Sequence, residues 1–281
     1  MATALASIAE IERELGSQRM GESGEPMQRT SVMTHIAWVP EQWVEAAEDV
    51  LAGLAERHPS RTIVLVPEPA ADDGLEASVE VDCYPVGSDR KVSMETIRLR
   101  LGGNRVEAPA SIVEPLLLPD LPVFLRWRGL PPFAEQPFEQ LVDTVDRLIV
   151  DSTEWPGLPA PYAWLANIFD RVAVSDIAWA RTSRWRRQLA SLWPGIADVE
   201  RMKVHGTEAQ AYLLAGWLRS RLKRPIDLEH EEADRLCGVE IDGEPAPFPP
   251  GDPPAPADLL SDELERFTRD RVYEDAVRAV A

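Results

Sequence analysis

Helical segments that alternate with short apolar runs are the feature that most limits how this chain of 281 residues can fold. Over residues 40–57 the apolar side chains recur every three or four positions, which predicts an amphipathic helix. After a His-Pro break, residues 62–66 read Thr-Ile-Val-Leu-Val, a β-branched apolar run typical of a buried strand. A helix followed closely by a buried strand favours a layered α/β fold.

Further strand and helix patterns extend this unit to about residue 153. Residues 76–84 and 96–101 alternate apolar with polar side chains, which predicts half-buried strands. Shorter apolar runs at 123–127 and 147–151 predict two more strands, with helices at 109–117 and 138–145. We therefore expect residues 31–153 to form an α/β domain with a mixed sheet.

A cluster of proline and glycine after Ser152 predicts a domain boundary, followed by a smaller α+β domain at residues 154–281. Helices are expected at 162–171, 176–193 and 208–222, and strands at 199–204 and 237–241. The seven prolines within residues 245–256 predict an extended, semi-rigid strap, and residues 258–280 predict a final amphipathic helix. Residues 1–30 are expected to form a flexible N-terminal appendage.

Charge and composition exclude several classes of protein. The chain carries 29 Lys plus Arg against 48 Asp plus Glu, a net charge of -19, so it lacks the basic footprint that nucleic acids and anionic membranes require. No stretch is long and apolar enough to span a membrane. Glutamates occupy the N-terminal region where a signal peptide would be apolar, and the two cysteines, Cys83 and Cys237, form no close pair. These patterns predict a cytoplasmic protein without a structural metal.

Signatures of catalysis are also missing from the sequence. It contains no GxSxG, P-loop or GxGxxG motif after a predicted strand, and no two of its four histidines are three or four positions apart. The sequence therefore lacks the motifs of a nucleophile-elbow hydrolase, a P-loop ATPase or a standard dinucleotide-binding enzyme, and we expect it to need no cofactor.

Tryptophan and arginine are concentrated in the predicted helix at 176–193, within a chain that has nine Trp against six Phe and four Tyr. Trp and Arg are enriched at the energetic centres of protein interfaces. One interpretation is that this segment contacts a partner, through Trp179, Arg181, Arg184, Trp185, Arg186 and Arg187. The other is that Trp179 and Trp193 pack in the core while the arginines are solvated or paired with acidic residues.

An anion site is the alternative to a partner surface. Ser60 and Arg61 lie where a helix gives way to a strand, and their side chains could hold a phosphate there. The arginines at 184–187 could do the same. Such a site would suit a sugar-phosphate binding protein or enzyme. Arg61 could instead pair with a nearby carboxylate, which would leave no anion site.

Several runs, taken in order, resemble the OpcA family, the glucose-6-phosphate dehydrogenase assembly proteins. They are HPSRTIVLV at 58–66, LLLPDLPV at 116–123 with Trp127, RLIVDS at 147–152, DIAWAR at 176–181 with RWR at 184–186, and DLLSDEL at 258–264 through YEDA at 273–276. The resemblance implies two domains that meet near residue 153. It also implies a non-enzymatic partner of glucose-6-phosphate dehydrogenase that promotes the active oligomer and so favours NADPH production in the oxidative pentose phosphate pathway. Thiol redox control, found in some members, would here depend on Cys83 and Cys237.

Overall fold

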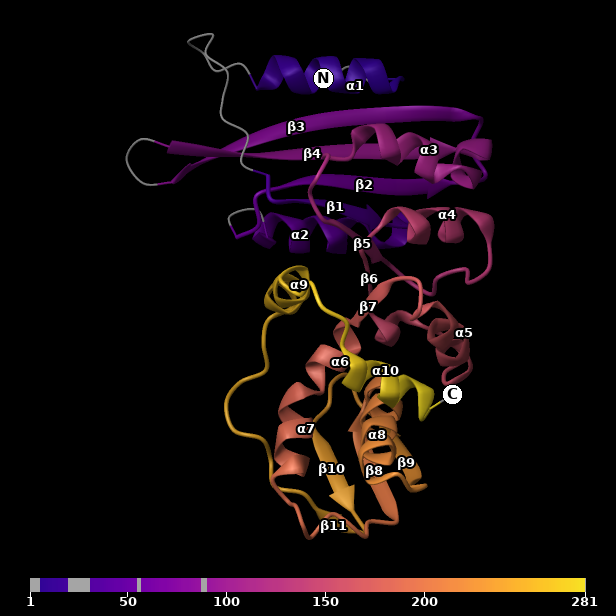
Figure 1. Ribbon diagram of the computed structural model, residues 1–281, viewed down its shortest axis with the longest axis vertical. Helices are drawn as coiled ribbons and strands as arrows, with labels where there is room; N and C mark the ends of the chain where they lie inside the picture. Colours follow the sequence, from indigo (N-terminus) through magenta and orange to yellow (C-terminus); the bar gives the residue numbers. More distant parts are fainter. Residues whose placement is uncertain (1–5, 20–30, 55–56, 87–89, 281) are drawn as a thin grey trace. The chain divides into compact units, whose positions relative to one another are not determined.

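The computed structural model describes residues 6–19, 31–54, 57–86 and 90–280. The chain divides into two compact units, Met1–Leu148 and Ile149–Ala281 (Figure 1). This division falls a few residues before the boundary that we expected at 153. The two units are described separately below.

The larger sheet contains strands β1 to β7 in the order β3-β4-β2-β1-β5-β6-β7. Strand β2 pairs in parallel with β1 and β4, β1 pairs in parallel with β5, and β3 is antiparallel to β4. The sheet is therefore mixed, which confirms the predicted α/β class. The strand bounds are β1 Met33–Trp38, β2 Ser60–Glu68, β3 Gly74–Val86, β4 Arg90–Gly102, β5 Val123–Trp127, β6 Arg147–Val150 and β7 Ala173–Asp176.

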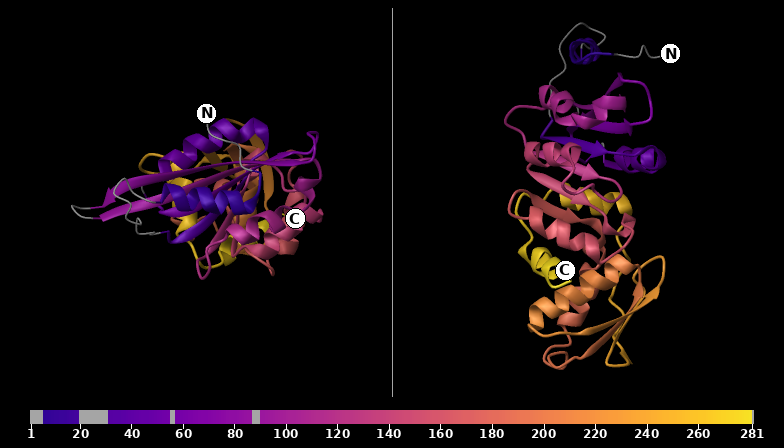
Figure 2. Two further views of the ribbon diagram at one scale, coloured as in Figure 1. Left: turned by 90° about the horizontal axis from the view of Figure 1, so that it is seen from above. Right: turned by 90° about the vertical axis from the view of Figure 1, so that its right-hand side faces the viewer.

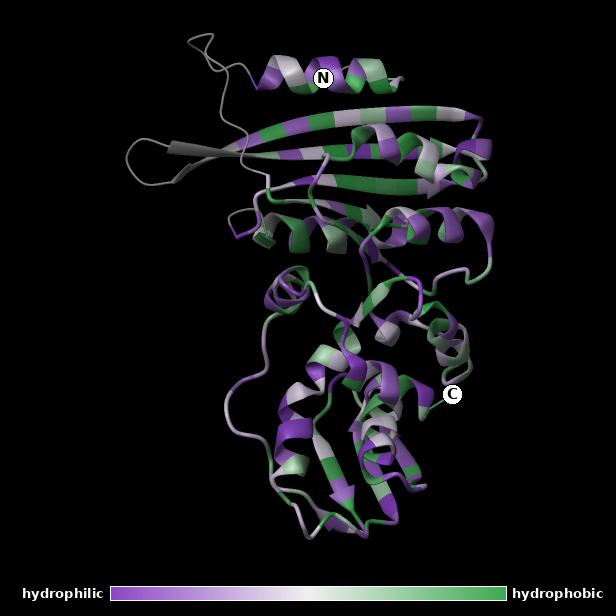
Figure 3. Ribbon diagram, in the orientation of Figure 1, coloured by the Kyte–Doolittle hydropathy of each residue, from purple (hydrophilic) through white to green (hydrophobic). Residues whose placement is uncertain are grey.

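In the first unit, helices pack on apolar residues of strands β1, β2 and β5. Helix α2, Val44–Leu54, follows a 3-10 turn and packs on a cluster that includes Ala37, Val64 and Val66. Helices α3, Pro109–Val113, and α4, Gln136–Thr144, pack against each other, and α4 also packs on β5. Figure 3 shows that β2 is apolar over most of its length, whereas apolar and polar residues alternate along β3 and β4.

Helix α1, Ile8–Gln18, lies within the segment that we expected to be a flexible appendage. Ser7 caps it, and Ile11 and Leu15, one turn apart, are fully buried. The helix packs against β3, as Figures 1 and 2 both show. The described part of the predicted appendage is thus a packed helix of the first unit, whereas its predicted link at 21–30 lies outside the described residues.

The second unit contains a four-stranded sheet in the order β11-β10-β8-β9. The acidic run at residues 227–232 forms β9, an exposed edge strand that pairs in parallel with β8. The strand bounds are β8 Arg201–Gly206, β9 Asp227–Glu232, β10 Gly238–Ile241 and β11 Glu244–Pro245.

The helices of the second unit are shorter than predicted in two places. The expected helix at 176–193 is divided at Thr182, whose hydroxyl bonds back to the carbonyl of Trp179 at 2.8 Å. The expected helix at 258–280 is also divided in two. The bounds are α5 Ala160–Ile168, α6 Ile177–Arg181, α7 Ser183–Ala190, α8 Glu208–Leu222, α9 Pro256–Leu264 and α10 Arg271–Arg278.

Helix α8 is the centre of this unit. Its N-terminus carries a capping box of Thr207 and Gln210, and it packs closely against α10. A side chain at Gly216 would collide with the carbonyl of Ala276, so glycine permits this approach of the two helices. No helix in the described ranges is long and apolar enough to cross a membrane.

Candidate functional site

The two tryptophans of the predicted partner surface are both buried. Trp179 on α6 is 3% exposed and Trp185 on α7 is 4% exposed. The indole nitrogen of Trp179 donates to Asp270 at 2.9 Å, and its ring lies 5.6 Å from that of Tyr273 on α10. Trp179 therefore fastens α6 to the start of α10. It shapes the surface around it without forming part of that surface.

The guanidinium group of Arg186 lies over the Trp179 ring rather than projecting into solvent. Its guanidinium carbon is 3.4 Å from the centre of the Trp179 ring, a cation–π contact. Its Nε donates to the hydroxyl of Thr182 at 3.0 Å. Burial lowers the pKa of Arg186 to about 10, so the side chain is still charged at neutral pH.

Arg181 ends α6 and binds the loop after β6. Its Nη1 donates to both carboxylate oxygens of Asp151, each at 2.8 Å. The Asp151 carboxylate also accepts a bond from the backbone N–H of Thr153. Arg181 thus has the bland role that the sequence left open, a cation paired with a local acid.

Four side chains form a fully buried polar cluster next to Arg181, which we call the Asp176 cluster: Ser152, Tyr162, Asp176 and Tyr273. Asp176 Oδ1 accepts from the backbone N–H of Ser152 and of Ala178, at 3.1 and 2.9 Å. Its Oδ2 accepts from the hydroxyls of Ser152 and Tyr273, at 2.7 and 3.2 Å, and Tyr162 donates to the Ser152 hydroxyl at 2.9 Å. All four residues are between 0 and 1% exposed.

No cation contacts Asp176 among the bonds described for it, and its ionisation reflects that. Burial, and then the charge of Asp151, raise the pKa of Asp176 from 3.8 to about 6. Burial also raises the pKa of Tyr162 and Tyr273 well above 10. Since all four side chains are closed off from solvent, the Asp176 cluster holds β7, α6, α5 and α10 together and offers no surface to a ligand.

The residues of the Asp176 cluster were not predicted as a group, although the sequence carries one local signal for Asp176. Asp176 precedes an apolar helical run, and its side chain caps α6 by accepting from Ala178. The partner from α10 is 97 residues away, so no local pattern could have joined it to Asp176.

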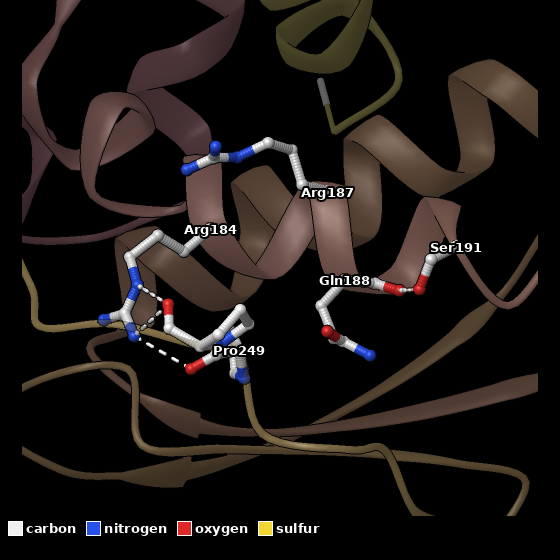
Figure 4. Close-up of a pocket in the computed structure, with 6 residues that line it drawn as sticks. Arg184, Arg187, Gln188, Ser191 and Pro249 are labelled. Atoms are coloured by element: carbon white, nitrogen blue, oxygen red, sulfur yellow. Dashed lines mark hydrogen bonds between the residues drawn. The ribbon is translucent and has the colours of Figure 1, made fainter.

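Arg184 binds the proline-rich strap, as Figure 4 shows. Its Nη2 donates to the carbonyls of Pro249 at 2.9 Å and Pro250 at 3.0 Å, and also to that of Gly251. Next to these bonds the Phe248 ring packs edge-on against Trp185, with centroids 5.5 Å apart. The strap is therefore fixed along α7 by a polar and an aromatic contact.

A groove of 190 Å³ separates α7 from the strap, and we call it the α7–strap groove. Its strap wall is formed by Pro249 and Pro250. Its helix wall is one stripe of polar side chains with i, i+3, i+4, i+7 spacing: Arg184, Arg187, Gln188 and Ser191. In the part of the chain that the structure describes, neither arginine forms an ion pair with a carboxylate.

The alternative anion site at Ser60 and Arg61 is buried. Arg61 is 2% exposed, and its Nε donates to Glu95 at 2.8 Å. Its Nη1 donates to Glu12 on α1 at 3.1 Å and to the carbonyl of Leu116 at 2.6 Å. Ser60 lies 3.3 Å from the hydroxyl of Thr62. These donors of Arg61 are therefore bonded to groups within the fold.

Glu95 is the centre of this network, which we call the Glu95 network: Glu12, Arg19, Arg61 and Glu95. Arg19, just after α1, donates to the second oxygen of Glu95 at 2.5 Å. Burial of Glu95 acts to raise its pKa, but the bonds and charges of Arg19 and Arg61 outweigh burial and lower it.

The described residues were also compared with the requirements of a metal site and of a reactive thiol. No group of three or more His, Cys, Asp or Glu side chains there could hold a metal ion. Cys237 is exposed and free, and the side chain of Cys83 lies outside the described residues.

Comparison with known proteins places this architecture in a family. Residues 52–168 match a model described as the glucose-6-phosphate dehydrogenase subunit N-terminal domain, and residues 172–247 match the corresponding C-terminal domain. OxPP cycle protein OpcA of Synechococcus elongatus is 27% identical over 227 residues, which cover 71% of this chain and 50% of that protein. The OpcA protein of Nostoc punctiforme is 28% identical over 195 residues, 64% of this chain and 42% of that protein.

The chain thus spans half or less of the length of the curated relatives it matches. The two matched ranges follow one another and together take in β2 to β11, the strap's beginning and most of the helices. They include Arg61 and Glu95 of the first unit and Ser152 and Asp176 of the second. The chain belongs to the OpcA family.

Proposed function

We propose that this chain binds glucose-6-phosphate dehydrogenase and promotes its active oligomer, without catalysing a reaction itself. The observation that carries the proposal is the ordered match of both units to domains described as those of a glucose-6-phosphate dehydrogenase subunit. The relatives are named as OxPP cycle proteins, which supports a role in the oxidative pentose phosphate pathway. Cytoplasmic NADPH production would rise with the activity of the dehydrogenase.

The mechanism that we propose is a shift in populations. A protein that binds one assembly state of the dehydrogenase more tightly than another moves the equilibrium toward the first state. A tenfold shift requires about 1.4 kcal/mol of differential binding free energy. This is within the reach of a single well-placed contact.

We place the contact surface on the exposed side of α7 and the strap. Trp179 and Trp185 are buried, so the accessible residues are Arg187 on α7, Phe248 on the strap and Trp193 beyond α7. Phe248 is 65% exposed and Trp193 is 64% exposed. Large aromatic side chains this exposed, in the same unit as an exposed arginine, have the composition of interface hot spots.

The test is a steady-state assay of the dehydrogenase from the same cell, with and without this chain, together with the mass of the mixture in solution. We expect higher activity and a larger complex that contains both proteins. Unchanged activity and no complex, with both proteins shown to be folded, would refute the proposal. The variant Trp185→Ala is a poor probe, because truncating a buried Trp costs about 3–5 kcal/mol of stability and binding would be lost by unfolding.

A further inference from the structure

We propose that the α7–strap groove receives a short segment of the partner that carries one or two carboxylates, with Arg187 as the residue that binds them. This inference rests on the proposed function, and it adds the chemistry of the partner and the residue that recognises it.

The groove is already formed in the chain by itself. Arg184 holds three successive strap carbonyls, those of Pro249, Pro250 and Gly251. The contact of Phe248 with Trp185 holds the same stretch of the strap against the helix. A partner that binds here does not have to order the strap, so less of its binding free energy is lost to conformational entropy.

The charges in the groove are unusual for this protein. Acidic residues outnumber basic ones by 48 to 29, and other arginines of the same unit, such as Arg181 and Arg269, contact carboxylates. Arg184 and Arg187 line the groove together, and no carboxylate among the described residues pairs with either. The segment from Ile177 to Ala190 contains four arginines and no acidic residue. A carboxylate would relieve the repulsion between the like charges.

Arg187 is the better placed of the two arginines to bind a partner. Arg184 donates its hydrogen bonds to the strap. Arg187 is exposed and makes a single long hydrogen bond, from Nε to the carbonyl of Ser183 at 3.4 Å. Its guanidinium therefore keeps most of its donors for a ligand. Guanidinium groups bind carboxylates through two parallel hydrogen bonds, which fixes orientation as well as adding affinity.

The second wall favours a peptide over a small anion. Pro249 and Pro250 form that wall, and the exposed Phe248 precedes them in the strap. The stripe from Arg184 to Ser191 extends for roughly 10 Å along α7, at about 1.5 Å per residue. A sugar phosphate would satisfy the arginines and leave the prolines uncovered, whereas a peptide can place carboxylates on one wall and apolar groups on the other. The net charge of -19 repels a highly acidic partner, so the segment carries few carboxylates.

The experiment measures binding of the full chain to the dehydrogenase by titration calorimetry, for the wild type, Arg187→Glu, Arg187→Lys and Arg221→Glu. Arg221 is an exposed arginine on α8, outside the groove, so its variant is matched in charge. We expect Arg187→Glu to weaken binding at least tenfold and Arg187→Lys to weaken it less, because lysine keeps the charge but not the paired bonds. Arg221→Glu should stay within twofold of the wild type. High salt should narrow the gap between the wild type and Arg187→Glu.

The outcomes separate this inference from the proposed function. If the wild type binds and Arg187→Glu binds equally well, the groove inference is wrong and the function stands. If the folded wild type does not bind the dehydrogenase, both are wrong. In a parallel melting experiment without the dehydrogenase, glucose 6-phosphate should leave the melting temperature of the wild type unchanged. Stabilisation that is lost in Arg187→Glu would identify a small-anion site and overturn the acidic-segment inference.

Discussion

Each unit of the molecule buries one carboxylate at the centre of a polar network, and the two networks solve the same problem differently. Glu95 is 0% exposed and lies between two guanidinium groups, those of Arg61 and Arg19. Asp176 is 1% exposed and is bonded by hydroxyls and backbone N–H groups. The cations lower the pKa of Glu95, whereas the dipoles around Asp176 leave its pKa raised. Hydrogen bonds from neutral groups therefore satisfy a buried carboxylate without fully offsetting the cost of its charge.

The two networks also share a feature. Each is completed by a helix outside the ranges that match the family models, since α1 and its C-terminal end supply Glu12 and Arg19, and α10 supplies Tyr273. The matched core contributes the carboxylate, and the flanking helices contribute groups that bond to it or to its partner.

The largest effect should come from removing the charge of Glu95. Glu95→Gln keeps the shape but leaves Arg61 and Arg19 without their shared carboxylate, and breaking a buried pair in this way costs about 3–5 kcal/mol. The free energy of unfolding in urea measures it. Glu80→Gln is the control, because Glu80 pairs with Arg98 on the surface, and its loss should cost no more than about 1 kcal/mol. Equal effects of the two variants would contradict the importance of burial.

The two carboxylates should give stability profiles of opposite slope with pH. The pKa of Asp176 is higher in the folded state, so its contribution is fully present below about pH 4 and is lost as the pH rises through about 6. The difference between a pKa of 3.8 in the unfolded chain and about 6 in the folded protein corresponds to a free energy of roughly 3 kcal/mol. Because the pKa of Glu95 is lowered, its contribution is present above about pH 4.5 and is lost as the pH falls.

Urea unfolding at a series of pH values between about 3 and 7 tests this contrast, because the contribution of Glu95 changes mainly below about pH 4.5 and that of Asp176 mainly between about pH 4 and 6. Asp176→Asn should remove the fall in stability that Asp176 causes, and Glu95→Gln should remove the rise that Glu95 causes. A difference between the wild type and Asp176→Asn that does not change across this range would contradict the raised pKa.

A smaller effect is expected for Tyr273→Phe. This variant removes one hydroxyl that donates to Asp176 at 3.2 Å, and a hydrogen bond to a charged group contributes about 1.5–3 kcal/mol. We expect a loss near the lower limit, because Asp176 keeps three other donors. Thermal unfolding at pH 7 measures it, with Tyr212→Phe on the partly exposed side of α8 as the comparison. A loss no larger than that of Tyr212→Phe would show that the bond does not stabilise the fold.

The smallest effect on stability should be that of Arg187→Glu. Arg187 is exposed and carries no ion pair among the described residues, so the free energy of unfolding should change by less than about 0.5 kcal/mol. A larger loss would show that Arg187 belongs to the fold and would make its binding variants unusable as probes of the groove.

Local sequence patterns were sufficient for the class of the fold and for many of its elements. The β-branched run at 62–66 lies inside β2, and the helical spacing at 40–57 contains α2. The same helical spacing divides α7 into two faces. Trp185 and Leu189, one turn apart, are buried, whereas Arg184, Arg187 and Gln188 lie together on the face that lines the groove. The Trp and Arg content alone, without this spacing, predicted Trp185 as a contact residue, whereas its side chain is buried.

Long-range pairs were beyond such patterns. Arg19 reaches Glu95 across 76 positions, and Arg61 reaches it across 34, so only the register of β2 and β4 brings the network together. The break at Thr182 was also not evident, because the sequence around it contains no proline or glycine that would predict the end of a helix. The bond from Arg184 to the carbonyl of Pro249 spans 65 positions, so it depends on the path that the strap takes in the folded chain.

The order of synthesis affects the two buried carboxylates differently. When Glu95 leaves the ribosome, Arg19 and Arg61 have already been synthesised. The Glu95 carboxylate can therefore bind both guanidinium groups as soon as β4 pairs with β2. Asp176 must wait for Tyr273, 97 residues later, which at 5–20 residues per second takes roughly 5–20 s. During that time α5 and α6 lack a partner from α10 and the Trp179 ring is uncovered on that side. The second unit is therefore the part of a nascent chain that a chaperone would need to protect.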